Sequence, residues 1–157
     1  MPYASSVPAA ITALVTAFRT SAGLGLADPK VPVRDGPELS QASGLEAVAV
    51  GYTGDQNEDV VTGTASPEGL AGLPDRERYA VMCAVEVIDP GADVAAARAR
   101  AYALHAACGA AIAADHTLSG KVLRADIGIG SLQQQQTETG ARARVMFPVN
   151  IDAFTSR

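Results

Sequence analysis

Carboxylate and amide side chains at alternate positions could bind calcium between residues 55 and 59. Asp55, Asn57 and Asp59 match the first three ligand positions of a calcium-binding loop. Such a loop has glycine at its sixth position and a bidentate glutamate at its twelfth. Because this chain has Val60 and Ser66 there, the sequence favours a solvated acidic loop over a calcium site.

The two histidines and two cysteines are the next groups that could do chemistry. His105 and His116 are eleven residues apart with no acid at metal-ligand spacing, so we expect no zinc site. A pairing of Cys83 with His105 would resemble a thiol nucleophile and its base, but the sequence shows no third partner. Cys83 and Cys108 form no CxxC pair and are predicted to be buried, reduced thiols rather than a disulfide. His105 is expected to be a packed or interface residue.

Glycines and arginines give the remaining candidates. Gly128 and Gly130 resemble part of a phosphate-binding loop, but the third glycine is missing and they lie in a predicted strand. Close backbone approach or twist is the favoured role for them. Arg98 and Arg100 could bind an anion, but inside an alanine-rich helix we expect them to be solvated or at an interface. The sequence therefore predicts no catalytic, cofactor-binding or metal-binding residue, and a protein that is not an enzyme.

Composition limits the classes of protein further. A chain of 157 residues is expected to form a single domain over 1–157. Aromatic residues make up only 4% and tryptophan is absent, so the core must be built from Ala, Val, Leu and Ile. A net charge of −5 argues against sequence-specific binding of nucleic acid. No signal peptide is visible and no run approaches the roughly 18 apolar residues of a membrane span, so we predict no membrane partner.

Apolar periodicity predicts the elements that must position these residues. Apolar side chains recur at helical spacing over 7–22 and 94–114, with Ser6 as the expected cap of the first helix. Strands are predicted at 31–34, 45–52, 79–88, 121–130 and 141–151. The order α-β-β-β-α-β-β predicts an α+β domain: an antiparallel sheet of about four to five strands with two helices packed on one face.

Two strands carry further information. The strand 79–88 is mostly apolar on both faces, so we expect helices on one face and a neighbouring subunit on the other. Pro148 cannot donate to a ladder, so the last strand should be an edge there, or bulged. A subunit interface is predicted from the apolar and cationic residues beside the core stripe: Met82, Ala84, Arg98, Tyr102 and His105.

Two polar segments are predicted to be irregular. The long loop 53–75 is rich in Gly and Pro with acids between them, and 133–140 is expected to be a glutamine-rich hairpin tip. Neither can belong to a packed core, so both are predicted to project and to order on a partner. The residues expected to make these axial contacts are Asp55, Glu58, Asp59, Gln133, Gln134, Gln135 and Gln136.

Several motifs together carry a resemblance to a family. They are VRDGPE, VEVIDPGAD, AAARARAYAL, TLSGKV, the glutamine-rich turn and GARARVMFPVNI. With these motifs the chain resembles the tail terminator proteins of long-tailed bacteriophages, particularly those of actinobacterial hosts. The resemblance covers most of the chain but not the loop 53–75.

The resemblance implies a structural virion protein without a cofactor or a reaction. Such a protein forms a ring, expected to be a homo-hexamer, on the head-proximal end of the tail tube. It stops tube polymerisation, and its partners are the tail tube protein and the head-completion (stopper or connector) protein. The implied location is the head–tail junction of the virion, after assembly in the bacterial cytoplasm. Two alternatives stay open: another head–tail connector or tube protein of related fold, and a cytosolic α+β ligand-binding or enzyme domain.

Overall fold

The computed structural model describes residues 4–37, 45–67 and 72–155. These residues form an α+β structure with two helices and a mixed sheet of seven strands. The helices are α1 (Val7–Arg19) and α2 (Val94–Ala114). The strands are β1 (Val33–Asp35), β2 (Glu46–Val50), β3 (Val61–Ser66), β4 (Arg76–Asp89), β5 (Arg124–Ile127), β6 (Ser131–Thr137) and β7 (Gly140–Phe154).

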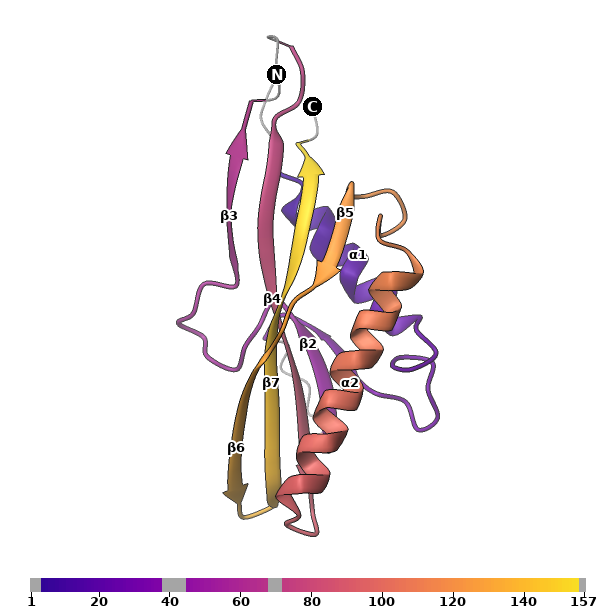
Figure 1. Cartoon of the computed structure of the whole chain (residues 1–157), viewed down its shortest axis with the longest axis vertical. Coiled ribbons are helices and arrows are strands. Elements are labelled where there is room, and N and C mark those ends of the chain that lie inside the picture. Colours follow the sequence, from indigo (N-terminus) through magenta and orange to yellow (C-terminus); the bar gives the residue numbers. More distant parts are fainter. Residues whose placement is uncertain (1–3, 38–44, 68–71, 156–157) are drawn as a thin grey trace.

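Two long antiparallel strands, β4 and β7, run along the whole molecule and form the centre of the sheet (Figure 1). On its outer side, each of these two strands pairs with one strand in its first half and with another in its second half. β4 pairs with β3 through residues 76–81 and with β2 through residues 83–87. β7 pairs with β6 through residues 140–146 and with β5 through residues 149–152. Both changes coincide at the pair Met82–Pro148.

Pro148 pairs with Met82 of β4 on one side and lies between the pairings of β7 with β5 and β6 on the other. The last strand therefore has no strand partner there on one side, although it is not an outer strand of the sheet. The carbonyl of Pro148 accepts a hydrogen bond from the Gly128 N–H at 2.8 Å. In an antiparallel strand the N and the C=O of one residue point the same way. The backbone nitrogen of Pro148, which has no hydrogen to donate, therefore faces the gap between β5 and β6, where no ladder hydrogen bond is required.

One face of β4 and β7 forms the hydrophobic core with both helices. Odd-numbered side chains of the two strands are buried against the apolar faces of α1 and α2. The largest fully buried side chains include Phe18, Leu104, Ile112 and Phe147. The even-numbered side chains point to the opposite face, where Ala84 is buried by the chain itself and Met82 is half-buried. Only part of this second face is therefore left for a neighbouring subunit.

The helix ends are fixed by different groups. The Asp93 side chain accepts a hydrogen bond from the Ala96 N–H at 3.1 Å and so caps α2. Ser6 occupies the N-cap position of α1, but its hydroxyl bonds to Glu77 on β4 instead of the first turn. The prediction that the Ser6 side chain caps α1 was therefore wrong. Its hydroxyl donates to Glu77 instead, because a carboxylate forms a stronger hydrogen bond than a neutral acceptor. α1 ends at Arg19, earlier than the predicted residue 22.

The observed sheet is larger than the predicted sheet of four to five strands and is not wholly antiparallel. β1 pairs with β2 in parallel. β3 lies inside the segment 53–75 that was predicted to be irregular, and β6 includes residues 133–137 of the predicted hairpin tip. Both are exposed strands beside a long partner, so their sequences lack the apolar alternation that would mark a strand. The predicted strand 121–130 is reduced to β5, because residues 121–123 form a turn and bend and residues 128–130 lie outside any strand. Residues 68–71 of the segment 53–75 lie outside the described residues.

Candidate interaction surfaces

The five predicted interface residues lie on two different surfaces. Arg98, Tyr102 and His105 lie on α2, which packs against the odd-numbered face of β4. Met82 and Ala84 belong to the even-numbered face and point away from α2. The structure therefore brings the three helix residues together but separates them from the two strand residues.

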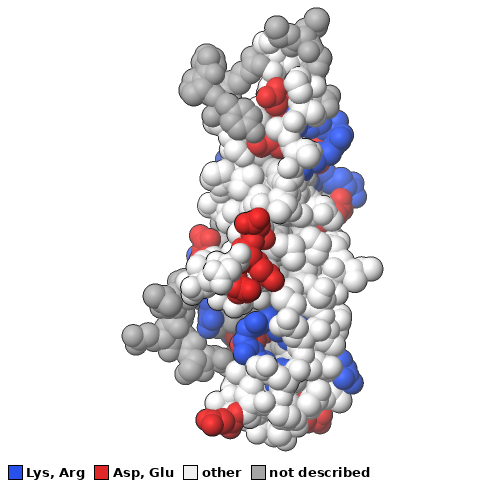
Figure 2. Space-filling model, turned by 90° about the vertical axis from the view of Figure 1, so that its left-hand side faces the viewer, with Lys and Arg blue, Asp and Glu red and all other residues white. Residues whose placement is uncertain are grey.

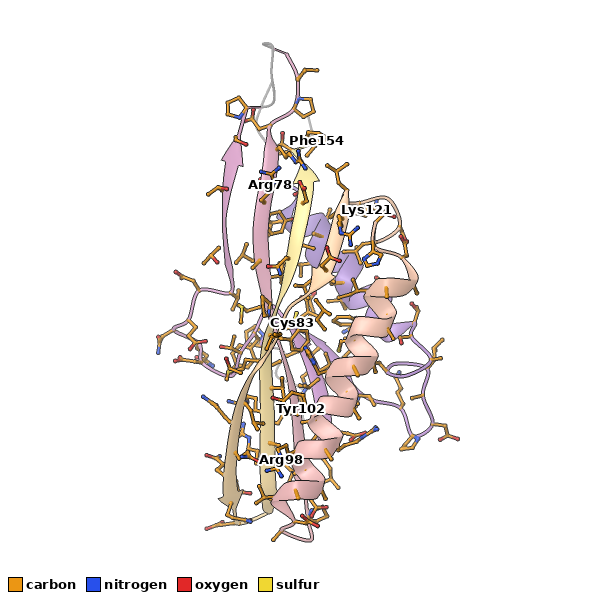
Figure 3. The ribbon with its side chains drawn as sticks, in the orientation of Figure 1. Arg78, Cys83, Arg98, Tyr102, Lys121 and Phe154 are labelled. Carbon is orange, nitrogen blue, oxygen red and sulfur yellow. The ribbon has the colours of Figure 1, made fainter. Side chains whose placement is uncertain are left out.

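The helix residues belong to a surface that α2 shares with the region of β6 (Figure 3). The Arg98 Nη1 donates to the Gln134 Oε1 at 2.9 Å. The His105 Nε2 lies 3.1 Å from the carbonyl oxygen of Gly128, and its ring meets the Phe147 ring edge-on at 4.7 Å. The Tyr102 ring lies edge-on to His105 with the centroids 6.3 Å apart. We call the surface formed by Arg98, Tyr102, His105, Ile129 and Gln134 the α2–β6 patch.

Ile129 is the most exposed large apolar residue described, with 94% of its surface accessible. It is held by two glycines that lie close against β7. A Cβ on Gly128 would be 2.6 Å from the Cγ of Pro148, and a Cβ on Gly130 would be 2.4 Å from the Cγ1 of Val145. Only glycine fits both positions without movement, which agrees with the close-approach role predicted for them. The sequence did not indicate that these glycines present an isoleucine to solvent.

The acidic loop, residues 53–59, projects between β2 and β3, midway along the molecule (Figure 1). Thr53 Oγ1 donates to the Glu58 carboxylate at 2.6 Å, and the Asn57 N–H donates to Asp55 at 2.8 Å. At its base, a Cβ on Gly54 would be 2.2 Å from the Arg144 Nη1, so the backbone rests on that guanidinium. Figure 2 shows acidic side chains gathered in the middle of this side of the molecule. The loop has a defined shape before any partner binds.

The four glutamines of β6 divide between the two faces of the strand. Gln134 and Gln136 turn toward α2, where the Gln136 Nε2 donates to the Ala92 carbonyl at 3.1 Å. Gln133 and Gln135 are paired in register with Arg144 and Arg142 and lie on the opposite face. All four are exposed. They therefore form two polar surfaces along one strand rather than the tip of a hairpin, which is at residues 138–139.

An ion cluster lies on the open face of the sheet beside the base of the acidic loop. Glu86 Oε2 accepts hydrogen bonds from Arg142 Nη2 at 2.7 Å, Arg144 Nη2 at 2.7 Å and Arg144 Nε at 3.1 Å. One carboxylate thus faces two guanidinium groups that are about three-quarters or more buried. The alternation of β7 places both arginines on this face, as the sequence predicts, but their shared acid was not predicted.

A groove of about 970 Å³ lies between α1 and the C-terminal part of α2. Small side chains line most of it, and among the described residues around it Asp115 and Lys121 are the charged ones. Sequence reasoning missed the groove because it followed the buried stripes of the helices. The signal was present in the outward positions, where α1 carries Ala and Thr and the C-terminal part of α2 carries Ala instead of charged residues.

Both thiols are buried and unpaired with each other, which confirms the predicted free cysteines. Burial raises the pKa of the Cys83 thiol to about 12, since the thiolate would lose its hydration. The same cause raises the pKa of Cys108. Neither thiol is therefore ionised near neutral pH.

Two further observations concern the described residues only. In that part of the chain, no three His, Cys, Asp or Glu side chains lie close enough together to hold a metal ion. None of the described helices has both the length and the hydropathy needed to cross a membrane. In comparisons with known proteins, no family matches the chain and no curated protein is similar to it.

Proposed function

We propose that this chain is a structural virion protein that forms a ring on the head-proximal end of a bacteriophage tail tube. The ring ends tube polymerisation and joins the tail to the head-completion protein. The motifs that resemble tail terminator proteins support this function. The structural observation that carries it is the outward surface of α2, which has the composition of a surface covered in an assembly.

Outside its buried stripe, α2 carries few charged residues. Its buried stripe faces β4 and β7, and its exposed residues are mostly alanines: Ala95, Ala96, Ala99, Ala103, Ala106, Ala110, Ala113 and Ala114. The helix contains no Asp or Glu. Its Lys and Arg residues are limited to Arg98 and Arg100, both exposed, and most of the remaining outer side is alanine. A helix facing water usually carries charged or polar residues over most of its outer side. This supports a homo-oligomer in which a neighbouring subunit covers α2.

The predicted contact residues fit this proposal in two groups. Arg98, Tyr102 and His105 are proposed to lie at the subunit boundary, and the half-buried Met82 is proposed to meet a second neighbouring surface on the opposite face, whereas Ala84 is buried within its own chain. The glutamines of β6 outside the α2–β6 patch are proposed to contact axial partners, the tail tube protein or the head-completion protein. They are Gln133, Gln135 and Gln136. The chain has no reaction or cofactor in this proposal.

The test is to add the purified chain to tail tube subunits that are polymerising. We expect the chain alone to form closed rings and the tubes to stop growing once rings cap them, as seen by electron microscopy. Long tubes made by the chain alone would indicate a tube protein instead. A monomer or dimer that binds a metabolite and leaves tube length unchanged would favour the ligand-binding or enzyme alternative.

A further inference from the structure

The acids of the acidic loop form no ion pair with a Lys or Arg among the described residues, although Arg144 lies under the loop backbone at Gly54. Asp55, Glu58 and Asp59 are all exposed, and the segment 51–60 contains no Lys or Arg. Among the described residues, the hydrogen-bond partners of Asp55 and Glu58 are the Asn57 N–H and the Thr53 hydroxyl, and neither partner is a cation. The loop is therefore an anionic projection whose shape is fixed by hydrogen bonds within itself.

The α2–β6 patch has the opposite character. Arg98 is exposed and is held by the neutral amide of Gln134 instead of a carboxylate. Tyr102, 40% exposed, lies one helical turn further along α2, and Ile129, 94% exposed, follows Gly128, whose carbonyl oxygen lies against His105. Arginine and tyrosine are enriched among the residues that dominate binding energy in protein interfaces. The other arginine of α2, Arg100, is already paired with Glu46 at 2.8 Å.

The geometry points to a lateral contact in which the acidic loop of one copy docks on the α2–β6 patch of the next copy. This inference rests on the proposed ring and identifies the surfaces that would close it. The loop projects from one side of the sheet and α2 lies on the other (Figures 1 and 3). A contact between two different surfaces is heterologous, and repeating it builds a closed ring when the rotation angle allows.

The contact combines charge with apolar area. Complementary charges mainly set the orientation and rate of association, while covering apolar surface supplies the driving force. Ile129 and Tyr102 provide exposed apolar surface beside Arg98, and Tyr52 and Val60 are half-exposed at the two ends of the loop. On this account the loop meets a neighbouring subunit instead of an axial partner.

A charge-reversal experiment tests the contact. Arg98→Glu and Asp59→Lys each place like charges across the proposed contact, and the double variant restores opposite charges in reversed order. Asp59 is chosen because Asp55 and Glu58 also hold the loop together. The matched controls are Arg78→Glu and Glu138→Lys, since both residues are exposed and lie outside the two surfaces. Sedimentation over a range of protein concentrations measures the midpoint of assembly, and circular dichroism checks the fold.

We expect each single reversal to raise the assembly midpoint about tenfold or more, the double variant to recover most of that loss, and both controls to assemble like the wild type. Single reversals that form rings normally, or a double variant without recovery, would overturn the inference while leaving the proposed ring intact. Reversals that form normal rings but fail to cap tubes would assign the loop to an axial partner. A wild-type chain that forms no ring would instead refute the proposed function.

Discussion

Replacing Glu77 with alanine should strongly destabilise the protein, because this carboxylate attaches α1 to β4. Glu77 is only 5% exposed. Its Oε2 accepts hydrogen bonds from the Ser6 N–H at 2.8 Å and the Ser6 hydroxyl at 2.5 Å. The same hydroxyl lies 2.9 Å from the Tyr79 hydroxyl. Glu77→Ala removes the acceptor and leaves buried donors at the start of α1.

The expected loss in the free energy of unfolding is about 3 kcal/mol. A hydrogen bond to a charged group contributes about 1.5–3 kcal/mol, and a buried donor left unsatisfied costs about 1–3 kcal/mol. These contributions are not additive, because the Ser6 hydroxyl can turn toward Tyr79. For a chain of this size, 3 kcal/mol corresponds to a fall in Tm of roughly 6–12 °C. Glu77→Gln, which keeps one acceptor oxygen, should lose about half as much.

Urea unfolding followed by circular dichroism measures this loss directly. All variants are compared at one protein concentration, because assembly stabilises the folded chain by mass action. Glu138→Ala is the control, since Glu138 is exposed in the β6–β7 turn, and it should change stability by less than about 0.5 kcal/mol. If Glu77→Ala were as stable as this control, the buried network would not hold α1 on the sheet.

Three other predictions follow from the packing and the ion pairs. Gly128→Ala should cost about 1–3 kcal/mol in urea unfolding, because its Cβ would meet the proline ring of β7; an unchanged midpoint would contradict the close approach. Cys83 and Cys108 should react slowly with a thiol reagent until denaturant is added, since burial raises the pKa of both; rapid labelling of the folded chain would contradict their burial. The hydrogen bond from Arg76 lowers the pKa of Asp152. This group therefore stabilises the fold above its unfolded pKa of about 4, and the contribution is lost as pH falls through the lower folded value. Asp152→Asn should make the loss of stability at low pH smaller. The change should be slight, because water screens the pair. If stability fell with pH equally in the variant and the wild type, the contribution of Asp152 would be contradicted.

The elements with strong apolar periodicity could be predicted from the sequence. The alternation through β4 and β7 is regular enough to assign each side chain to a face, and the buried stripe of α2 was identified correctly. β3 and β6 could not be predicted in the same way. Their sequences, VTGTAS and SLQQQQT, are mostly polar, and they are strands because the long strands β4 and β7 offer them unpaired backbone groups.

The candidate surface was only partly predictable. Helical spacing correctly grouped Arg98, Tyr102 and His105 on one side of α2. Strand parity places Met82 and Ala84 on the face away from the helices, as the alternation of this strand predicts, because the buried Cys83 faces the helices. The exposure of Ile129 was missed because the close approach of its two flanking glycines to β7 cannot be recognised from the sequence.

The mass of the purified chain under native conditions, with class averages of its particles by electron microscopy, tests the central claim most directly. The proposed function predicts a closed ring of six copies, with a mass of about 96 kDa, six times the 16.0 kDa of the chain. It also predicts that these rings bind to one end of tail tubes. A monomer or dimer of the wild-type chain at every concentration, with no binding to tube ends, would contradict the proposal.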